Sequence, residues 1–270
     1  MAAQAGVSDW TGRRVLVTGA SSGIGAALAR DLASHGATVG ICARRTDLLQ
    51  QVLADCRRSV PDCRAWTIDL ADLGRLDDFV ARVEDTLGRI DVLVNNAALA
   101  LAGPATTTPW ADIEQLLRVD YLSPVRLTLA ALPAMRARGS GQILTLSSMA
   151  ARMSTPGEAA YAAPKAALTA WFEALAGELW DSGITVHLVY PALIDVQTDA
   201  DGDDALAETP NVATNIPAPV CARAIRRQLE RGDLELYVPT PARDAVVQRA
   251  LDTRASVELM ANWYRAGSPH

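Results

Sequence analysis

Lysine is almost absent from this sequence. Only one of the 25 lysine and arginine residues in the 270-residue chain is a lysine, and it is Lys165. Histidine and cysteine are also scarce, and neither shows the spacing of a metal site or of a C-x-x-C redox pair. These residues are His35, His187, His270, Cys42, Cys56, Cys63 and Cys221. We therefore expect no bound metal and reduced thiols, although a bridge between Cys56 and Cys63 stays open as an alternative.

Long apolar stretches and excess positive charge are absent too. No apolar run approaches the roughly 20 residues that cross a membrane, and residues 1–10 have neither the basic start nor the apolar core of a signal peptide. The net charge of −6 argues against binding nucleic acid or anionic membrane through bulk electrostatics. We therefore expect a cytoplasmic protein that binds neither. Half of the residues are hydrophobic, which is enough to bury a large core.

Short apolar segments alternate with longer segments of helical periodicity. This alternation is typical of an α/β fold, a doubly wound parallel sheet with helices on both faces. We expect strands at 15–18, 38–42, 64–68, 91–95, 142–146, 185–189 and 235–238, and helices near 23–35, 46–58, 73–87, 110–137, 159–181, 218–230 and 243–264. No linker or repeat divides the chain, so residues 1–270 are predicted to form one domain. The segment 192–219 is predicted to be a substrate loop, with a plain surface loop as the alternative.

The first predicted strand runs into a glycine-rich turn that opens the first predicted helix. The turn reads Thr18-Gly19-Ala20-Ser21-Ser22-Gly23-Ile24-Gly25. Glycines in this position let the backbone approach a pyrophosphate at a helix N-terminus. The turn therefore predicts a dinucleotide site, because it lies between a strand and a helix as that motif requires.

Two arginines follow the second predicted strand, where NAD-binding proteins usually carry an acidic residue. Arg44 and Arg45 suit the 2′-phosphate of NADP(H), because a guanidinium binds phosphate through paired hydrogen bonds. The alternative is a solvated helix start whose charge Asp47 partly neutralises. We favour NADP(H) over NAD(H) as the cofactor.

Lys165 lies four residues after Tyr161 in a predicted helix. Residues four apart share a helix face, so the ammonium is able to lie beside the phenol. A neighbouring cation favours the phenolate and lowers the pKa of a tyrosine, as a general acid or base requires. The alternative is a surface lysine beside an unrelated tyrosine.

These motifs and three others resemble the compact branch of the short-chain dehydrogenase/reductase family over residues 12–239. The glycine turn matches the family's cofactor turn, Asp69-Leu70 matches the pair expected against the adenine, and Asn95-Asn96-Ala97-Ala98 is similar to the family's N-N-A-G. Ser148 follows the fifth predicted strand and lies thirteen residues before Tyr161, which is the family's usual separation. The resemblance implies a Rossmann-type fold with about seven strands.

The resemblance also implies an NAD(P)-dependent oxidoreductase that moves a hydride between the nicotinamide and a carbonyl or secondary alcohol. Tyr161 is then the general acid or base, Ser148 positions the carbonyl oxygen, and Lys165 binds the nicotinamide ribose and lowers the tyrosine pKa. The implied cofactor-binding residues are Gly19, Ser21, Ser22, Gly23, Ile24, Gly25, Arg44, Arg45, Asp69, Leu70, Asn96, Ala97, Tyr161, Lys165, Pro191 and Ile194.

Relatives of this kind commonly form homodimers or homotetramers through the helix of the catalytic tyrosine. Trp171, Leu175 and Leu179 lie on one stripe of that helix here. This stripe is either a subunit interface or part of the core of a single subunit.

The chain departs from the family pattern near the catalytic residues. Asp120 replaces a catalytic asparagine that is thought to hold a water relaying protons to the lysine. We expect an altered pH dependence from this change rather than inactivity. Pro164 lies between Tyr161 and Lys165, and because proline is tolerated in a first helical turn, we expect the helix to begin close to Tyr161.

A second departure follows the sixth predicted strand. Ala192 replaces the glycine that usually follows Pro191, and Val196 replaces a threonine, with Thr198 two residues later. Ile194 matches the position that contacts the carboxamide of the nicotinamide.

The expected substrate walls carry no charge, which favours an apolar or weakly polar small molecule, unless these residues are simply core. They are Leu99, Ala100, Leu101, Met149, Met153 and Leu193. The helix at 243–264 is expected to pack on its own domain, with a partner subunit or the substrate mouth as alternatives.

Two other functions stay open. Asp120 and Ala192 favour an NADP(H)-binding sensor or scaffold without efficient turnover, and epimerisation or dehydration is possible on the same fold.

Overall fold

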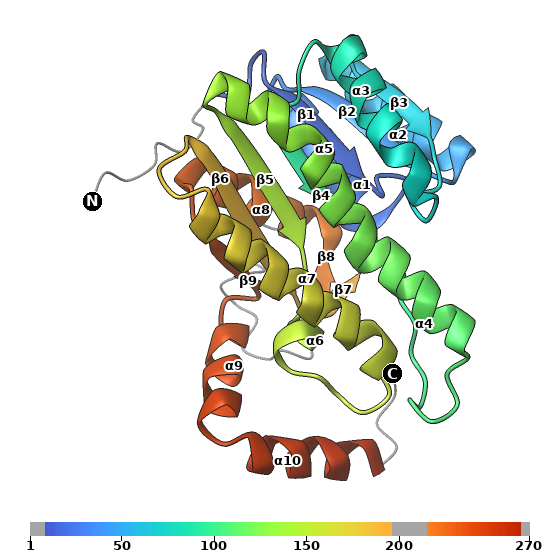
Figure 1. Ribbon diagram of the computed structural model, residues 1–270, viewed down its shortest axis with the longest axis vertical. Coiled ribbons are helices and arrows are strands. Elements are labelled where there is room, and N and C mark those ends of the chain that lie inside the picture. Colours follow the sequence, from blue (N-terminus) through green and yellow to red (C-terminus); the bar gives the residue numbers. More distant parts are fainter. Residues whose placement is uncertain (1–8, 196–214, 266–270) are drawn as a thin grey trace.

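The computed structural model describes residues 9–195 and 215–265 and contains a central sheet of seven parallel strands. The strand order is β3-β2-β1-β4-β5-β6-β9, so the chain reverses its direction of travel between β1 and β4. The strands are β1 (Arg14–Thr18), β2 (Thr38–Ala43), β3 (Arg64–Thr67), β4 (Val92–Asn95), β5 (Gly141–Leu146), β6 (Ile184–Pro191) and β9 (Glu235–Val238). The predicted doubly wound α/β fold is confirmed (Figure 1).

Helices cover both faces of this sheet. One face packs against α1 (Gly23–Ser34), α2 (Thr46–Ser59) and α8 (Ala218–Arg231), and the other packs against α3 (Leu76–Leu87), α5 (Ser123–Arg138) and α7 (Ala159–Glu178). Figure 1 shows α5 and α7 on the near side of the sheet and α1 and α8 behind it. The strands are apolar on both sides for this reason: Val15 and Val17 enter one core layer, and Leu16 enters the other.

The structure corrects the predicted helix at 110–137. Helix α4 (Trp110–Leu117) and helix α5 are joined by a π-helical turn, Arg118–Leu122, rather than by regular helix. A π turn inserts one extra residue per turn and is frequent at functional sites. Here it carries Asp120, which is completely buried.

Helix α7 begins at Ala159, close to Tyr161 as expected. Pro164 nevertheless falls in the second turn and not the first, so its ring removes one backbone hydrogen bond of the helix. Leu175 and Leu179 are buried in the core, which decides in favour of the core alternative for these two residues.

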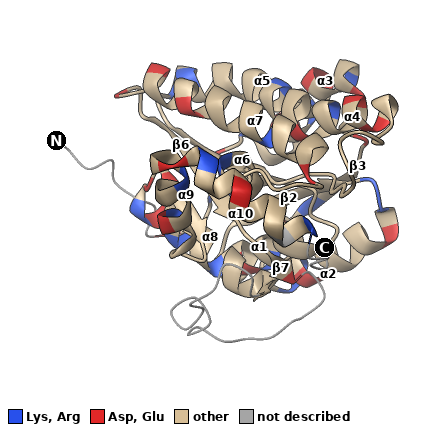
Figure 2. Ribbon diagram, turned by 90° about the horizontal axis from the view of Figure 1, so that it is seen from below, with Lys and Arg blue, Asp and Glu red and all other residues tan. Residues whose placement is uncertain are grey.

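The single helix predicted at 243–264 is wrong. The chain forms α9 (Ala242–Leu251) and α10 (Thr253–Arg265), separated at Asp252, whose φ of −145° is extended. Val246 packs against the core, but Val257 is 60% exposed, so α10 does not pack on the domain as a continuous face. Seen from below, α10 lies across the carboxyl-end side of the sheet (Figure 2).

Three short elements were not predicted. They are α6 (Met149–Arg152) and a parallel pair formed by β7 (Ile194–Asp195) and β8 (Ile216–Pro217). Both strands of the pair lie within the segment 192–219 that was predicted to be a substrate loop, and residues 196–214 of it, including Val196 and Thr198, lie outside the described residues.

The four cysteines are all buried and unpaired, and burial raises the pKa of Cys56 to about 12. Within the described parts of the chain, no helix is both long and apolar enough to span a bilayer.

Candidate active site

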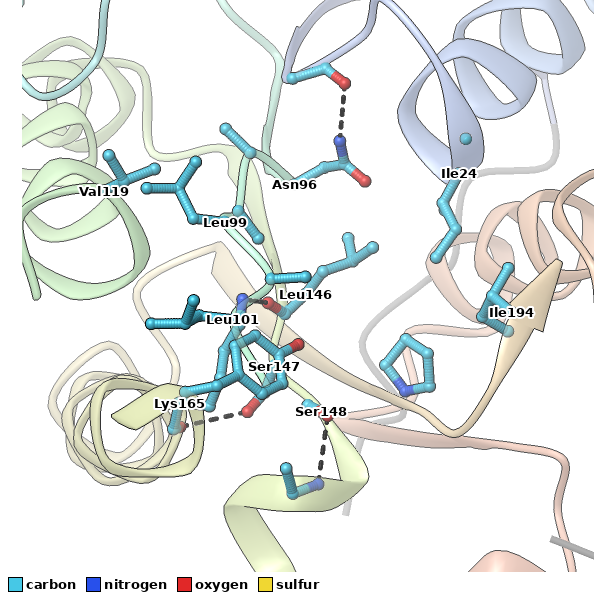
Figure 3. A pocket seen from close by; sticks show the side chains of 18 of the residues that line it. Ile24, Asn96, Leu99, Leu101, Val119, Leu146, Ser147, Ser148, Lys165 and Ile194 are labelled. Atoms are coloured by element: carbon cyan, nitrogen blue, oxygen red, sulfur yellow. Dashed lines mark hydrogen bonds between the residues drawn. The ribbon is translucent and has the colours of Figure 1, made fainter. Parts of the chain in front are cut away.

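A cavity of about 930 Å³ opens at the carboxyl ends of β1, β4, β5 and β6. This is the edge of a doubly wound sheet where ligands bind, at the point where the strand order reverses. All of the predicted catalytic and cofactor-binding residues line the cavity except Gly25 and Asp120. Figure 3 shows Ile24 and Ile194 on one side of the cavity and Leu99, Leu101 and Val119 on the other.

The glycine turn is packed directly against the end of β4. The amide of Asn96 donates to the carbonyl oxygens of Thr18 at 2.7 Å and Gly19 at 3.2 Å. A Cβ at Gly25 would lie 2.3 Å from Asn96 Nδ2, and a Cβ at Gly19, whose φ is +68°, would lie 2.6 Å from Ala97 Cα. Gly25 therefore has a packing role beneath the cavity, because no side chain fits there.

The N-terminus of α1 is suited to a phosphate group. Ser22 is the N-cap of α1 and makes no side-chain hydrogen bond to the first turn. The first N–H groups of a helix lack partners within the helix, and together with the helix dipole they favour an anion. Gly19, Ser21, Ser22 and Gly23 all line the cavity at this end, so the residues present fit the pyrophosphate of a dinucleotide.

Arg45 joins the glycine turn to the end of β2. Its guanidinium donates to Ser21 Oγ at 2.9 Å and also to Ser22 Oγ. Arg44 is exposed at the cavity edge next to it. One guanidinium group therefore contacts the glycine turn and a second lines the same cavity, an arrangement that fits a second phosphate on the adenosine ribose.

Asp69 and Leu70 line the cavity after β3. Asp69 Oδ1 accepts a hydrogen bond from the backbone of Ala71 at 3.0 Å, which orients the carboxylate locally. Pro191 and Ile194 line the opposite end, at the end of β6 and in β7.

Ser148 follows β5 and serves as the N-cap of α6. The backbone N–H of Ala150 donates to Ser148 Oγ at 3.1 Å, as Figure 3 shows. A hydroxyl that accepts through one lone pair keeps its own proton to donate elsewhere. Ser148 is thereby oriented with a donor available toward the cavity.

Tyr161 and Lys165 lie on the same face of α7, as their spacing predicts. The Lys165 Nζ is 5.7 Å from the centre of the Tyr161 ring and donates to the carbonyl oxygen of Leu146 at 3.1 Å. Lys165 is only 2% exposed, although its side chain reaches the cavity. Such burial leaves little space for the larger, planar head of an arginine, which agrees with the retention of lysine here.

Asp120 lies behind this pair and not at the cavity surface. Its Oδ1 accepts from the backbone N–H of Leu99 at 2.8 Å, and its Oδ2 is 3.5 Å from Lys165 Nζ, an ion pair without a well-directed hydrogen bond. Burial raises the pKa of Asp120, and the Lys165 ammonium opposes that rise. The carboxyl group therefore links Leu99 in the cavity wall to the ammonium.

The predicted apolar walls are present, together with residues that sequence reasoning missed. Leu259 and Met260 of α10 also line the cavity, which favours the substrate-mouth alternative for the C-terminal segment. Glu158 lines it too, contrary to the expectation of uncharged walls, and accepts a hydrogen bond from Thr155. Glu158 is the N-cap of α7, three residues before Tyr161 and one residue before the helix predicted at 159–181, and this closeness to Tyr161 was the available signal.

Comparison with known proteins identifies the family. The model of the short chain dehydrogenases matches residues 13–207. The chain is 29% identical over 259 residues to ketoacyl reductase HetN from Nostoc sp., covering 94% of this chain and 90% of that protein. The chain belongs to the short-chain dehydrogenase family, whose members are NAD(P)-dependent oxidoreductases.

Solved structures agree with this assignment. A short-chain dehydrogenase from Streptomyces avermitilis matches with a TM-score of 0.79 and 33% identity, covering 97% of this chain and 98% of that one. A metagenomic short-chain oxidoreductase in complex with NADP matches with a TM-score of 0.72 and 30% identity, covering 85% and 96%.

Proposed function

We propose that the protein is an NADP(H)-dependent oxidoreductase that interconverts a carbonyl and a secondary alcohol on an apolar or weakly polar small molecule. One observation carries this proposal. Ser148, Tyr161 and Lys165 converge on a cavity that is also lined by the glycine turn and by Arg44 and Arg45.

The cofactor, when bound, supplies or accepts the hydride. Tyr161 donates its phenolic proton to the carbonyl oxygen during reduction and recovers a proton from the alcohol during oxidation. Ser148 donates a hydrogen bond to the same oxygen and keeps its proton, while its own Oγ accepts from the Ala150 N–H. Both donors lie on fixed elements, the start of α6 and the first turns of α7, so the oxygen is held in one place.

Lys165 is held in place by its contacts to Leu146 O and Asp120. From that position its ammonium would bind the ribose hydroxyls of the nicotinamide half, and it lies 5.7 Å from the centre of the Tyr161 ring. Asp120 acts through Lys165 and is therefore a positioning residue in this mechanism.

A preference for NADP(H) over NAD(H) is supported by the two arginines after β2. The guanidinium of Arg45 donates hydrogen bonds to Ser21 and Ser22 of the glycine turn. Arg44 is exposed, so its side chain is accessible to a phosphate group. The NADP bound by a structural relative agrees with this preference.

The substrate class is supported by the cavity walls. Leu99, Leu101, Leu193 and Met260 present apolar surface, while Glu158 adds a carboxylate beside Tyr161. The name of the Nostoc relative, a ketoacyl reductase, is consistent with a carbonyl on an apolar body.

The alternative function is an NADP(H)-binding sensor or scaffold without efficient turnover. The observation in its favour is Asp120, whose carboxyl group pairs with the ammonium that the mechanism uses. Binding of NADPH without turnover of any carbonyl would support this alternative.

The experiment that tests the proposal is a fluorescence titration of the purified protein with NADPH and NADH, repeated with Arg44→Ala and Arg45→Ala. Tighter binding of NADPH that both variants weaken supports the cofactor assignment, and a preference for NADH contradicts it. A screen of aliphatic and aromatic ketones follows, with Tyr161→Phe as the inactive control. Activity that survives in Tyr161→Phe contradicts the assigned role of the tyrosine.

We also propose that residues 1–270 form one domain that assembles as a homodimer or homotetramer in the cytoplasm. Trp110 on α4 and Leu129 on α5 are 69% and 53% exposed, as expected of surfaces that a partner covers. Buried, unpaired cysteines suit a reducing compartment. Light scattering coupled to size-exclusion chromatography tests the assembly, and a monomer would contradict it.

A further inference from the structure

The helical turn that follows Ser148 is too short to be stable alone. Helix α6 has four residues. Isolated helices of that length do not form in water, because the conformational entropy lost in ordering the first turn exceeds the gain from its first hydrogen bond. Ser148 Oγ takes its orientation from this turn through the Ala150 N–H. Contacts from elsewhere in the fold must therefore hold α6, and with it the hydroxyl.

Arg152, the last residue of α6, makes those contacts. Its Nη2 donates to Tyr190 Oη at 2.8 Å and to Glu235 Oε1 at 2.8 Å, and it also forms an ion pair with Glu173. The guanidinium lies 4.8 Å from the centre of the Tyr190 ring as well. One side chain thus ties α6 to α7, β6 and β9.

The network reaches the other side of the cavity through β6. Tyr190 is fully buried and stacks on Tyr237 of β9, with ring centres 4.7 Å apart and directly paired backbones. Pro191, the next residue, lines the cavity at the end where the nicotinamide is expected. Tyr190 is therefore fixed from two sides, and it fixes the strand end that carries Pro191.

The ion pairs of Arg152 differ from ordinary surface pairs in their surroundings. The side chain of Arg152 is 25% exposed, and its partners come from three elements that are distant in sequence. Partial burial and charge-assisted hydrogen bonds strengthen such contacts, whereas exposed pairs contribute little. The protein also contains an exposed arginine ion pair, in which Arg126 binds both carboxylate oxygens of the single residue Asp77.

We propose that Arg152 is a positioning residue for the reaction: it clamps α6 onto β6 and β9 and so sets the distance between the Ser148 hydroxyl and the strand end at Pro191. This inference rests on the proposed oxidoreductase function. Arg152 does not touch the substrate oxygen, and it acts through the orientation of Ser148.

The kinetic test compares Arg152→Gln and Tyr190→Phe with Arg126→Gln as the matched control. Loss of the clamp leaves the cofactor turn intact, so we expect the NADPH dissociation constant and KM to change little. We expect kcat to fall by about 10- to 100-fold in Arg152→Gln, the scale of a small misplacement of a catalytic group, and by less in Tyr190→Phe. Arg126→Gln should keep wild-type kcat. A kcat for Arg152→Gln equal to that of the control overturns the proposal.

Arg152→Lys provides a rescue test. Lysine restores the positive charge, but its side chain is one bond shorter than the path to the arginine Nη2 atom, which makes all three contacts. We expect only partial recovery of kcat relative to Arg152→Gln. Full recovery would show that charge alone is needed, which overturns the clamp.

Amide hydrogen exchange separates the clamp from the reaction itself. In Arg152→Gln and Tyr190→Phe, the amides of Ala150 and Met153 should exchange faster, while those of α3 stay protected. If the wild-type protein turns over no carbonyl, the proposed function fails, yet this measurement still decides whether Arg152 holds α6. Unchanged exchange at both amides overturns the inference even in an active enzyme.

Discussion

Replacing Asp120 with asparagine should shift the pH dependence of turnover without abolishing it. The substitution keeps the shape of the side chain and one acceptor for the Leu99 N–H, but removes the negative charge beside Lys165. Without that charge the Lys165 ammonium, which lies 5.7 Å from the centre of the Tyr161 ring, acts on the reacting groups uncompensated. Reduction should therefore decline at lower pH than in the wild type, and oxidation should begin at lower pH.

The size of the shift follows from the separation of the two charges. At 3.5 Å, unit charges attract by about 5 kcal/mol at an effective dielectric constant of 20. Burial acts in the opposite direction by raising the pKa of Asp120, which disfavours the charged form of its carboxyl group. Because about 1.4 kcal/mol corresponds to one pH unit, the midpoint should move by about one unit if roughly a quarter to a third of this attraction is transmitted to the reaction.

The assay is the pH profile of kcat/KM in both directions, since this ratio reports ionisations of the free enzyme. Asp112→Asn is the matched control, because Asp112 is an exposed carboxylate on the same helical run. An Asp120→Asn profile that overlays the wild type would refute the reasoning. It would mean that the buried carboxyl group already carries a proton at working pH.

Three further changes test other parts of the structure. Gly25→Ala should lower the free energy of unfolding by about 1–3 kcal/mol and weaken NADPH binding, because the added Cβ would collide with the Asn96 side-chain amide. Gly177→Ala is the control, because a Cβ at Gly177 meets no atom within 4 Å. Equal denaturation midpoints for the two variants would contradict this prediction. Burial lowers the pKa of His187 in the folded protein. The free energy of unfolding should therefore be highest above the unfolded-state pKa of about 6.5 and should decrease as the pH falls below that pKa. The Tm of His187→Gln should fall less steeply with decreasing pH than the Tm of the wild type. An identical dependence of Tm on pH would assign the acid sensitivity to another group. Glu158→Gln should lower KM for an anionic ketone relative to a neutral one, and an unchanged ratio would place the carboxylate away from the substrate.

The fold and the core of the site were predictable because their signals are local. Each buried strand appears as a short apolar run, and the glycine turn and the Tyr161–Lys165 spacing each lie within one strand–turn–helix unit or one helix. Residues at the ends of β1, β4 and β5 meet in one cavity because parallel strands end at the same edge.

Features that depend on contacts between distant segments were not predictable in this way. Sequence periodicity shows that Asp120 lies in a helical segment, but not that a π turn buries it against Lys165. It likewise predicts one C-terminal helix, whereas the break at Asp252 brings Met260 to the cavity.

The sequence by itself determined the order of strands and helices, the phosphate-binding turn and the three residues of the proposed reaction. Only the tertiary structure decided which side chains hold them in position. Arg152 shows the reason: its partners Glu173, Tyr190 and Glu235 lie 21, 38 and 83 residues away along the chain. No local pattern encodes such contacts, because they exist only once β6 and β9 pair and α6 and α7 pack beside them.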